Sequence, residues 1–437
     1  MSGVGLTPWQ RVRRSFAVTS TAAGVYLGYK AIQFQERRLG LDSARAQAKR
    51  RAHHRRSAQA AYRAAVDLQG LLIKACQLIG SRADILPEEY VVVLSRLQDQ
   101  VPPRPFAVIE EQVRRELGRR PERIFAEFDR EPVAAASLAQ VHRARLRDGR
   151  PVAVKVQYPG IEELVRGDLQ NLLLLLGVLS RLERGFDVSS VAQELQRNVP
   201  QELDFINEGR NAETMARHFA GFDAVVVPGI VWEHTTRRVL VMELVGGVKV
   251  TDVAGLEAAG IDRQAVARLL IDAYFRQMFV HGFFHADPHP GNLFVQPGPR
   301  LVFVDFGLAK TLSPAFRAAM VRLTRALMAQ DEGAMAGALL DMGFRTRNGD
   351  PKTLVALGQA FVGTALLSGR PYADPDMVTE VNRRLARVFR DNPVTRVPAD
   401  ILLIGRVMGL LSGLSKQLDS QVNVLETLRP YALAGSP

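Results

Sequence analysis

One segment, residues 281–307, constrains this 437-residue chain more than any other. It reads HGFFHADPHPGNLFVQPGPRLVFVDFG. Asp287 and Asn292 are five positions apart, and Asp305 follows eighteen positions after Asp287 inside an Asp-Phe-Gly triplet. The apolar runs at 293–295 and 301–304 predict short strands beside these polar residues. We therefore expect a chemical site on loops that short strands hold in place.

These residue types suit phosphoryl transfer from ATP. Asp287 would orient or deprotonate the acceptor hydroxyl, while Asn292 and Asp305 would hold the metal ions that neutralise the phosphates. The Asp-x4-Asn spacing is that of a kinase catalytic loop, and Asp-Phe-Gly closes the metal site. The alternative, a loop in which Asp287 and His289 only form hydrogen bonds, does not account for the whole set. The sequence thus implies ATP and Mg²⁺ as cofactors.

Lys155 lies upstream in the apolar run Val-Ala-Val-Lys-Val. A lysine in such a strand more often faces solvent, but beside a metal site we interpret it as the residue that holds the α- and β-phosphates. It then needs a carboxylate partner to orient it. The run PQELDFINEGRNAE offers three candidates, Glu202, Asp204 and Glu208.

The expected phosphate loop lacks glycine. Where a Gly-x-Gly-x-x-Gly turn should precede the first hairpin, the chain has Val133 followed by Ala134, Ala135, Ala136 and Ser137. A Cβ restricts the positive-φ conformations that glycine offers, and this changes how backbone N–H groups approach phosphate. We expect nucleotide binding with an altered geometry.

The pattern along the body predicts an α+β fold with a small β-rich lobe and a larger helical lobe. Residues 137–146 and 152–156 are typical of an antiparallel hairpin with a turn at Asp148-Gly149. The apolar run 172–176, in a helix predicted over 161–184, is too short to cross a bilayer and is expected to be buried. Gly246-Gly247 is interpreted as a hinge. Further helices are predicted at about 58–82, 87–97, 106–117 and 190–218, and strands at 225–231 and 238–243.

This gives four expected parts. A basic N-terminal segment covers 1–56, a helical extension 57–125, the β-rich lobe with its helical insertion 126–247, and the helical lobe 248–437.

Charge is concentrated at the N-terminus. The net charge is +12, of which residues 1–56 carry +10 because they hold 12 Lys/Arg and 2 Asp/Glu. The rest of the chain is nearly neutral, which argues against a nucleic-acid partner. Residues 45–56, RAQAKRRAHHRR, are typical of a contact with an anionic membrane surface. A solvated helix face is the alternative. The single cysteine, Cys76, cannot form an internal disulfide.

Residues 15–29 carry no charge, and three alternatives remain open for them. Fifteen helical residues span about 22 Å, and extension to residue 34 would just reach across a bilayer. A membrane span or interfacial anchor, a cleaved targeting segment and a soluble packing helix all fit. The excess of positive charge after this stretch would place the body on the cytoplasmic or matrix side. The expected location is the cytoplasmic face of a bacterial inner membrane or the matrix face of a mitochondrial one.

The motifs resemble those of the UbiB-like, aarF-domain atypical kinases over roughly residues 57–430. The resemblance rests on the alanine loop 134–137, the Glu-x-Asp at 202–204, HADPHPGN and Asp-Phe-Gly. It implies a protein-kinase-like fold with an N-terminal helical extension. It further implies that a Lys-x-Gly-Gln motif, here Lys74-Ala75-Cys76-Gln77, packs over the active site and engages Glu202 and Asp204. By the same resemblance, Glu208 is the salt-bridge partner of Lys155.

The family resemblance also implies a role in ubiquinone biosynthesis or lipid homeostasis, with ATPase activity favoured over protein phosphorylation. The residues independently disfavour a protein substrate. Helical periodicity resumes within about ten residues of Asp305-Phe-Gly, so no long activation segment is expected. Three functions stay open: a membrane-associated ATPase or phosphotransferase acting on a lipid or quinone precursor, a protein kinase, and a non-catalytic nucleotide-gated adaptor. The oligomeric state is left open.

Overall fold

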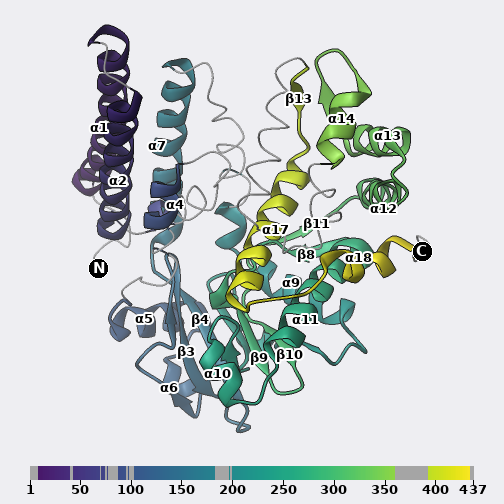
Figure 1. Cartoon of the computed structure of the whole chain (residues 1–437). Coiled ribbons are helices and arrows are strands. Elements are labelled where there is room, and N and C mark those ends of the chain that lie inside the picture. The colour runs from purple at the N-terminus through teal and green to yellow at the C-terminus, as the bar shows by residue number, and fades with distance from the viewer. Residues whose placement is uncertain are drawn as a thin grey trace. The chain divides into compact units, whose positions relative to one another are not determined.

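The computed structural model describes residues 8–39, 43–68, 70–73, 76, 87–94, 97, 103–182, 196, 199–359 and 392–433. The chain forms two compact units, each described here by itself (Figure 1). Unit 1 comprises Met1–Asn207 and Ile230–Leu244, and unit 2 comprises Glu208–Gly229 and Val245–Pro437. The segment Glu208–Gly229 was expected within the β-rich lobe, but it belongs to unit 2.

Unit 1 contains the N-terminal helices and a five-stranded sheet. Its helices are α1 (Pro8–Leu39), α2 (Ser43–Leu68), α4 (Glu88–Leu94), α5 (Phe106–Leu117), α6 (Pro121–Ile124), α7 (Ile161–Leu182) and the short η2 (Trp232–His234). Its strands are β1 (Glu127–Phe128), β2 (Ala134–Ala135), β3 (Ala139–Arg145), β4 (Pro151–Gln157) and β6 (Val239–Glu243).

The predicted hairpin is confirmed. Strands β3 and β4 pair antiparallel, with Arg145 opposite Pro151, and β6 continues the sheet on the other side of β4. Gly149 closes the turn at a φ of 89°, where a side chain would be strained. The predicted helix 106–117 is also confirmed as α5, which ends at Gly118 in the left-handed conformation. One face of the sheet packs with Ile109 and Val113 of α5 and with the start of α7 in a single core.

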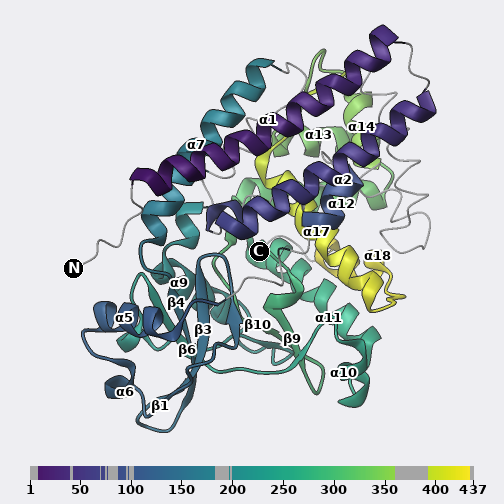
Figure 2. The same ribbon diagram turned by 90° about the vertical axis from the view of Figure 1, so that its left-hand side faces the viewer.

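Helix α1 packs alongside α2 and against α7 through a buried ion pair (Figure 2). The Arg14 guanidinium donates from Nε to Asp168 Oδ1 at 3.1 Å and from Nη2 to Oδ2 at 2.6 Å. A second donor, Nη1, contacts the Leu68 carbonyl at the end of α2. About one helical turn beyond Asp168 on α7, Asn171 donates to the hydroxyl of Ser15, the residue after Arg14, at 2.8 Å. The Ser15 contact fits the packing-helix alternative for residues 15–29, and the interfacial anchor and the targeting segment stay predictions.

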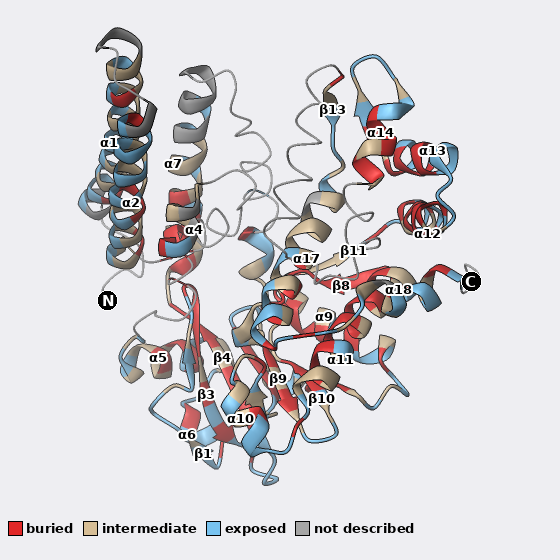
Figure 3. Ribbon diagram, viewed as in Figure 1, coloured by how far each residue is buried: buried red, intermediate tan, exposed pale blue. Residues whose placement is uncertain are grey.

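The apolar stretches of α1 and α7 were expected to lie in a membrane or in the core. None of the described helices, α1 included, is long and apolar enough to cross a membrane. The expected burial of the leucine run in α7 is wrong at Leu174, which is 70% exposed. Among its described residues, the side chains that α7 does bury lie nearer its start, at Ile161, Val165 and Asp168, and the first two belong to the sheet core. The contrast between the buried strands and the exposed faces of α1 and α2 is visible in Figure 3.

Unit 2 is mostly helical, as expected from residue 262 onward. Its helices are α9 (Phe205–His218, which begins in unit 1), α10 (Val253–Ala258), α11 (Arg263–Phe275), η3 (Arg276–His281), η4 (Pro290–Asn292), α12 (Pro314–Met328), α13 (Glu332–Met342), α14 (Pro351–Gly358), α17 (Ala399–Gln417) and α18 (Val424–Leu433). Its strands are β5 (Val225–Val226), β7 (Val248–Lys249), β8 (Phe283–His285), β9 (Leu293–Gln296), β10 (Arg300–Phe303), β11 (Ala309–Thr311), β12 (Arg345–Thr346) and β13 (Val394–Arg396).

Unit 2 contains a four-stranded sheet in the order β5-β10-β9-β7. The predicted strands 293–295 and 301–304 are its central pair, β9 and β10, and α11 packs against β10. Close packing also explains why one residue of the pair interpreted as a hinge, Gly247, is glycine. A Cβ on Gly247 would lie 2.7 Å from the Val295 carbonyl oxygen, so only glycine allows this approach to β9. Gln296 also holds the Gly246 carbonyl, at 2.8 Å.

Candidate functional site

Lys155 lies in the middle of β4, opposite Val141 of β3 and Leu240 of β6. Its ammonium group lies 5.2 Å from the centre of the Phe205 ring, a cation–π contact at the first residue of α9. Phe205 is buried, so the Lys155 stem packs on an apolar cluster while its head points to the start of α9. Glu208 is on the same helix, one turn further along, in unit 2. Its pairing with Lys155 stays a prediction.

The alanine loop is part of a hairpin instead of preceding one. Ala134 and Ala135 form β2, which pairs with β3 opposite Val141 and Gln140. The N–H of Ala136 donates to the Ala139 carbonyl at 2.8 Å and closes the turn, and Ser137 is buried. The loop backbone is thus tied to the strand that pairs with β4. The phosphate-binding role of residues 134–137 remains a prediction.

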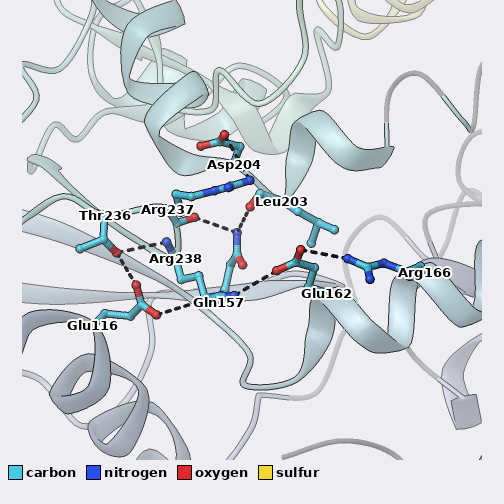
Figure 4. A network of polar contacts seen from close by, with 9 residues as sticks. All are labelled: Glu116, Gln157, Glu162, Arg166, Leu203, Asp204, Thr236, Arg237 and Arg238. Atoms are coloured by element: carbon cyan, nitrogen blue, oxygen red, sulfur yellow. Dashed lines mark hydrogen bonds and ion pairs between the residues drawn. The ribbon is translucent and has the colours of Figure 1, made fainter.

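Asp204 has a structural role that the sequence did not reveal. Its Oδ1 accepts from the backbone N–H groups of Ile206 at 3.1 Å and Asn207 at 3.4 Å, so it caps α9. Its Oδ2 lies 3.6 Å from the Arg237 guanidinium (Figure 4). Glu202 is the last residue of a short helical stretch, 199–202, before α9 and is half-buried. Lys74 and Gln77, the predicted partners of Glu202 and Asp204, are outside the described residues.

A polar network fixes the segment before α9 to the sheet (Figure 4). The Gln157 amide donates to the carbonyls of Leu203 at 2.9 Å and Arg237 at 3.3 Å. Arg238 joins two helices, since it contacts Glu116 of α5 at 3.1 Å and Glu162 of α7 at 3.0 Å. The start of α9, and with it the residues beside Lys155, is therefore held by both the sheet and the helices around it.

The loop of unit 2 that carries Asp287 is organised by a buried histidine. His285 is the last residue of β8. Its backbone N–H donates to Gln277 Oε1 at 2.8 Å, and its ring Nε2 contacts the Asp305 carbonyl. A carbonyl only accepts, so Nε2 carries the proton, and Nδ1 accepts from the Tyr274 hydroxyl at 3.3 Å and the Asp287 N–H at 3.4 Å. Burial lowers the pKa of His285 more than the nearby carboxylates raise it, so the ring is neutral. One side chain thus joins the two loops that carry Asp287 and Asp305.

Asp287 and Asn292 are brought together as predicted. Asn292 Nδ2 donates to the Asp287 carbonyl at 3.3 Å, and its N–H donates to the His289 carbonyl at 2.9 Å. His289 in turn accepts from the Gly291 N–H at 3.1 Å and caps the short helix η4. The Asn292 carbonyl accepts from the Val304 N–H at 3.2 Å, one residue before Asp305. The spacing seen in the sequence therefore closes into one compact loop.

The Asp-Phe-Gly triplet is held from both sides. Asp305 Oδ1 accepts from the Gly307 N–H at 3.0 Å, and a Cβ on Gly307 would lie only 3.3 Å from that oxygen. Glu208 Oε1 accepts from the Phe306 N–H at 3.4 Å, and Asn211 donates to the Phe306 carbonyl at 3.0 Å. Helix α9 thus orients the triplet through Glu208, a contact that sequence reasoning did not anticipate.

The donor set fits Mg²⁺. Hard cations prefer oxygen ligands, and Mg²⁺ is usually held by one or two carboxylates together with substrate phosphates. The Asp305 carboxylate and the amide oxygen of Asn292 supply such ligands, since Asn292 uses Nδ2 for its hydrogen bond to the loop. No cluster of three or more His, Cys, Asp or Glu side chains suited to a metal occurs among the residues that the structure describes. A carboxylate together with an amide oxygen suits a metal ion that binds with phosphate.

Sequence reasoning missed Arg406, which lies on α17, far along the chain from the catalytic loop. Its Nη2 is 3.4 Å from Asp287 Oδ1, and the Arg406 side chain is only 10% exposed. A pairing across so many residues leaves no periodicity or spacing to detect. The only available signal was a charged residue inside an otherwise apolar helical run.

Cys76, which replaces the glycine of the Lys-x-Gly-Gln motif, packs against a small apolar cluster that includes Ile73 and Leu94. Burial raises the pKa of its thiol to about 12. The thiolate is the nucleophile, so we expect Cys76 to react with iodoacetamide at pH 8 at least about 100-fold more slowly in the folded protein than in guanidinium chloride. Mass spectrometry of timed samples measures this. Equal rates would contradict the interpretation of Cys76 as a packing residue.

Comparisons with known proteins agree with this geometry. The model of the ABC1 atypical kinase-like domain matches residues 96–339. The chain is 36% identical over 393 residues to Protein ACTIVITY OF BC1 COMPLEX KINASE 8, chloroplastic, of Arabidopsis thaliana, covering 83% of this chain and 52% of that protein. It is 41% identical over 268 residues to AarF domain-containing protein kinase 1 of Xenopus tropicalis, covering 60% of this chain and 51% of that protein. The chain thus spans about half the length of these relatives.

A solved structure, that of a complex of Rv3197 with erythromycin from Mycobacterium tuberculosis, is similar with a TM-score of 0.59 and 26% identity. The match covers 81% of this chain and 89% of that one. The expected protein-kinase-like α+β fold is confirmed. The family model matches more than half of the residues, and its span includes Lys155, Asp287, Asn292 and Asp305. This chain belongs to the ABC1 atypical kinase-like family, whose members include the aarF-domain proteins.

Proposed function

We propose that the protein uses Mg²⁺ and ATP for phosphoryl transfer, to water or to a small lipid-like acceptor, at a membrane surface. The observation that carries the proposal is the joining of the Asp287 and Asp305 loops by His285. Phosphoryl transfer depends on positioning and charge stabilisation more than on covalent chemistry. A rigid link between the two loops supplies that positioning.

Each residue then has a task. Asp287 accepts the proton of the acceptor or orients it, and the neutral His285 keeps both loops in register without adding charge. Lys155 contacts the α- and β-phosphates, and Glu208 holds the backbone of Phe306 so that the Asp305 carboxylate points into the site. Bound Mg²⁺ would neutralise the phosphate charge and would be held by Asn292 and Asp305.

The segment after Asp-Phe-Gly favours a small acceptor over a protein. Strand β11 begins two residues after Gly307 and pairs with β8, and α12 starts at Pro314. Ser313 caps this helix by accepting from the Phe316 N–H at 3.2 Å. The expected early return to helix is confirmed, so this segment lacks the length of a peptide-docking platform. A protein kinase is therefore the second choice.

The surface of α1 supports a membrane site of action. Its exposed large apolar residues are Trp9, Val12, Phe16, Leu27 and Phe34. Trp9 and Leu27, like Phe16 and Phe34, are about five full turns apart at 3.6 residues per turn, so they lie on one face. The adjacent α2 exposes Arg45, Lys49, Arg51, Arg55 and Arg56. Apolar side chains beside basic ones are typical of helices that lie in an anionic lipid interface.

The acceptor class rests on the family resemblance. A lipid or isoprenoid-quinone precursor would share the membrane that α1 and α2 contact, at the cytoplasmic face of a bacterial membrane or the inner membrane of an organelle. A relative named as chloroplastic is consistent with an organelle as one setting.

The test is phosphate release by the purified full chain with Mg²⁺-ATP, measured with and without vesicles containing anionic lipid. We expect turnover that EDTA abolishes and that anionic vesicles stimulate. ATP-dependent thermal stabilisation without any turnover would overturn the proposal in favour of the nucleotide-gated adaptor. Lipid and quinone extracts of a deletion strain, compared with the parent, then identify the acceptor class.

The α1 surface makes a separate prediction. The Trp9→Ser/Phe16→Ser variant is expected to bind vesicles of mixed neutral and anionic lipid at least about tenfold more weakly, because each large apolar side chain contributes about 1.5–3 kcal/mol on burial. Co-sedimentation measures it. A control, Leu340→Ser/Leu433→Ser, removes exposed apolar residues elsewhere and should bind like the parent. Equal loss in both variants would contradict a specific role for α1.

A further inference from the structure

Helix α17 is attached to the active-site elements of unit 2 near its start and just beyond its end. Near its start, Asp400 lies 3.9 Å from Lys310 of β11, the strand that follows Asp-Phe-Gly. Beyond its end, the Asp419 carbonyl accepts from Gln264 of α11 at 2.7 Å. The buried residues Val407, Leu411 and Leu414 recur at three- and four-residue spacing and hold one face of the helix in the core.

Between these attachments, α17 presents Arg406 to Asp287. The two side chains are 10% and 21% exposed, and the contact of 3.4 Å is both a hydrogen bond and an ion pair. Tyr274 borders the same carboxylate from α11, and burial followed by the Asp287 charge raises the pKa of its hydroxyl well above the usual value. A guanidinium at hydrogen-bond distance fixes the orientation of such a partly buried carboxylate.

The catalytic loop itself offers no arginine beside the aspartate. The residue before Asp287 is Ala286, which is fully buried. The cation comes instead from a helix that starts more than a hundred residues later. Arginine suits this task better than lysine, since its planar fork fixes a carboxylate in orientation as well as in charge.

We propose that Arg406 is a positioning residue that holds the Asp287 carboxylate aimed at the acceptor, so that α17 completes the catalytic loop. This inference rests on the proposed function. It assigns part of the catalytic arrangement to the C-terminal region of the chain, beyond the 96–339 span of the family model.

The experiment compares Arg406→Gln and Arg406→Lys with the parent in Mg²⁺-ATP turnover. We expect Arg406→Gln to lower kcat about 10–100-fold, as loss of an orienting partner does at other sites, and to change KM for ATP less than about threefold. Arg406→Lys should recover part of kcat, because lysine keeps the charge and lacks the planar fork.

Two controls separate positioning from folding. Arg263→Gln removes another arginine, which contacts Asp419 just beyond the end of α17 at 3.4 Å, and should leave kcat unchanged. In an Asp287→Asn background, Arg406→Gln should cause no further loss, because a positioning residue acts only through its partner. Thermal unfolding confirms that each variant is folded.

The outcomes are distinct. Parent protein without turnover overturns the proposed function and this inference with it. Turnover by the parent, with a kcat that Arg406→Gln leaves unchanged, overturns the inference alone. An equal further loss in the Asp287→Asn background does the same, since it assigns Arg406 a purely structural role. If Arg406→Gln does not fold, Arg406→Lys decides, because a folded Arg406→Lys variant with the kcat of the parent would also overturn the inference.

Discussion

Replacing Asp305 with asparagine is expected to reduce Mg²⁺-ATP turnover about 100- to 1,000-fold, the range seen when one preorganised charge-stabilising group is lost. The substitution keeps the shape of the side chain. It also keeps a side-chain oxygen to accept the hydrogen bond from the Gly307 N–H, which is 3.0 Å from Asp305 Oδ1 in the parent. It removes the negative charge that would hold Mg²⁺ against the phosphates. Phosphate release at saturating ATP, measured over a Mg²⁺ series, checks the prediction.

The matched control is Asp331→Asn, which makes the same chemical change in the same unit. Asp331 caps α13 by accepting from the Ala334 N–H at 2.9 Å, and asparagine is as good a cap. Turnover and thermal unfolding of this variant should equal those of the parent. If Asp305→Asn turns over ATP as fast as Asp331→Asn, the assignment of the metal site is wrong.

Replacing Arg14 with methionine is expected to lower the free energy of unfolding by about 3–5 kcal/mol, since it leaves a buried carboxylate without its guanidinium. Asp168 is only 5% exposed and accepts both hydrogen bonds from Arg14. Methionine retains most of the apolar stem of arginine, so the decrease in the free energy of unfolding measures the contribution of the charge and its hydrogen bonds. Chemical denaturation followed by circular dichroism measures it, with Arg13→Met on the exposed face of the same helix as the control.

The destabilisation should also depend on pH. Burial raises the pKa of Asp168, and Arg14 opposes this rise. Without Arg14 the folded pKa should rise further above the unfolded value, so stability falls as the pH rises through that pKa and recovers in acid. Asp168→Asn in the Arg14→Met background should recover part of the loss. Equal stability of Arg14→Met and Arg13→Met would contradict the role of this ion pair in docking α1.

The sequence was sufficient wherever contacts are local. The alternation and the Asp148-Gly149 turn predicted the β3–β4 hairpin, and periodicity with Gly118 predicted α5 to its last residue. The spacing of Asp287 and Asn292 predicted a loop that the structure closes with hydrogen bonds over five residues. Such features depend on neighbours in the chain, so residue identity and order determine them.

The sequence did not predict contacts between residues that are far apart in the chain. Asp204 caps α9 and lies beside Arg237, a role that the sequence did not predict, while its expected contact with Lys74 and Gln77 stays a prediction because those two residues lie outside the described part of the chain. Gly247, in the pair interpreted as a hinge, is also needed for close packing on β9. Leu174 was expected to be buried and is 70% exposed.

By itself, then, the sequence determined which segments are candidates for the chemistry of this protein: the loops that carry Asp287, Asn292 and Asp305, the strand with Lys155, and the basic N-terminal region. The tertiary structure decided how those groups are held. It joined the two loops through His285, placed Arg406 beside Asp287, and docked α1 through Arg14 and Asp168. The physical reason is that an ion pair between residues more than a hundred positions apart forms only when packing brings two helices or loops together, and no local pattern encodes it.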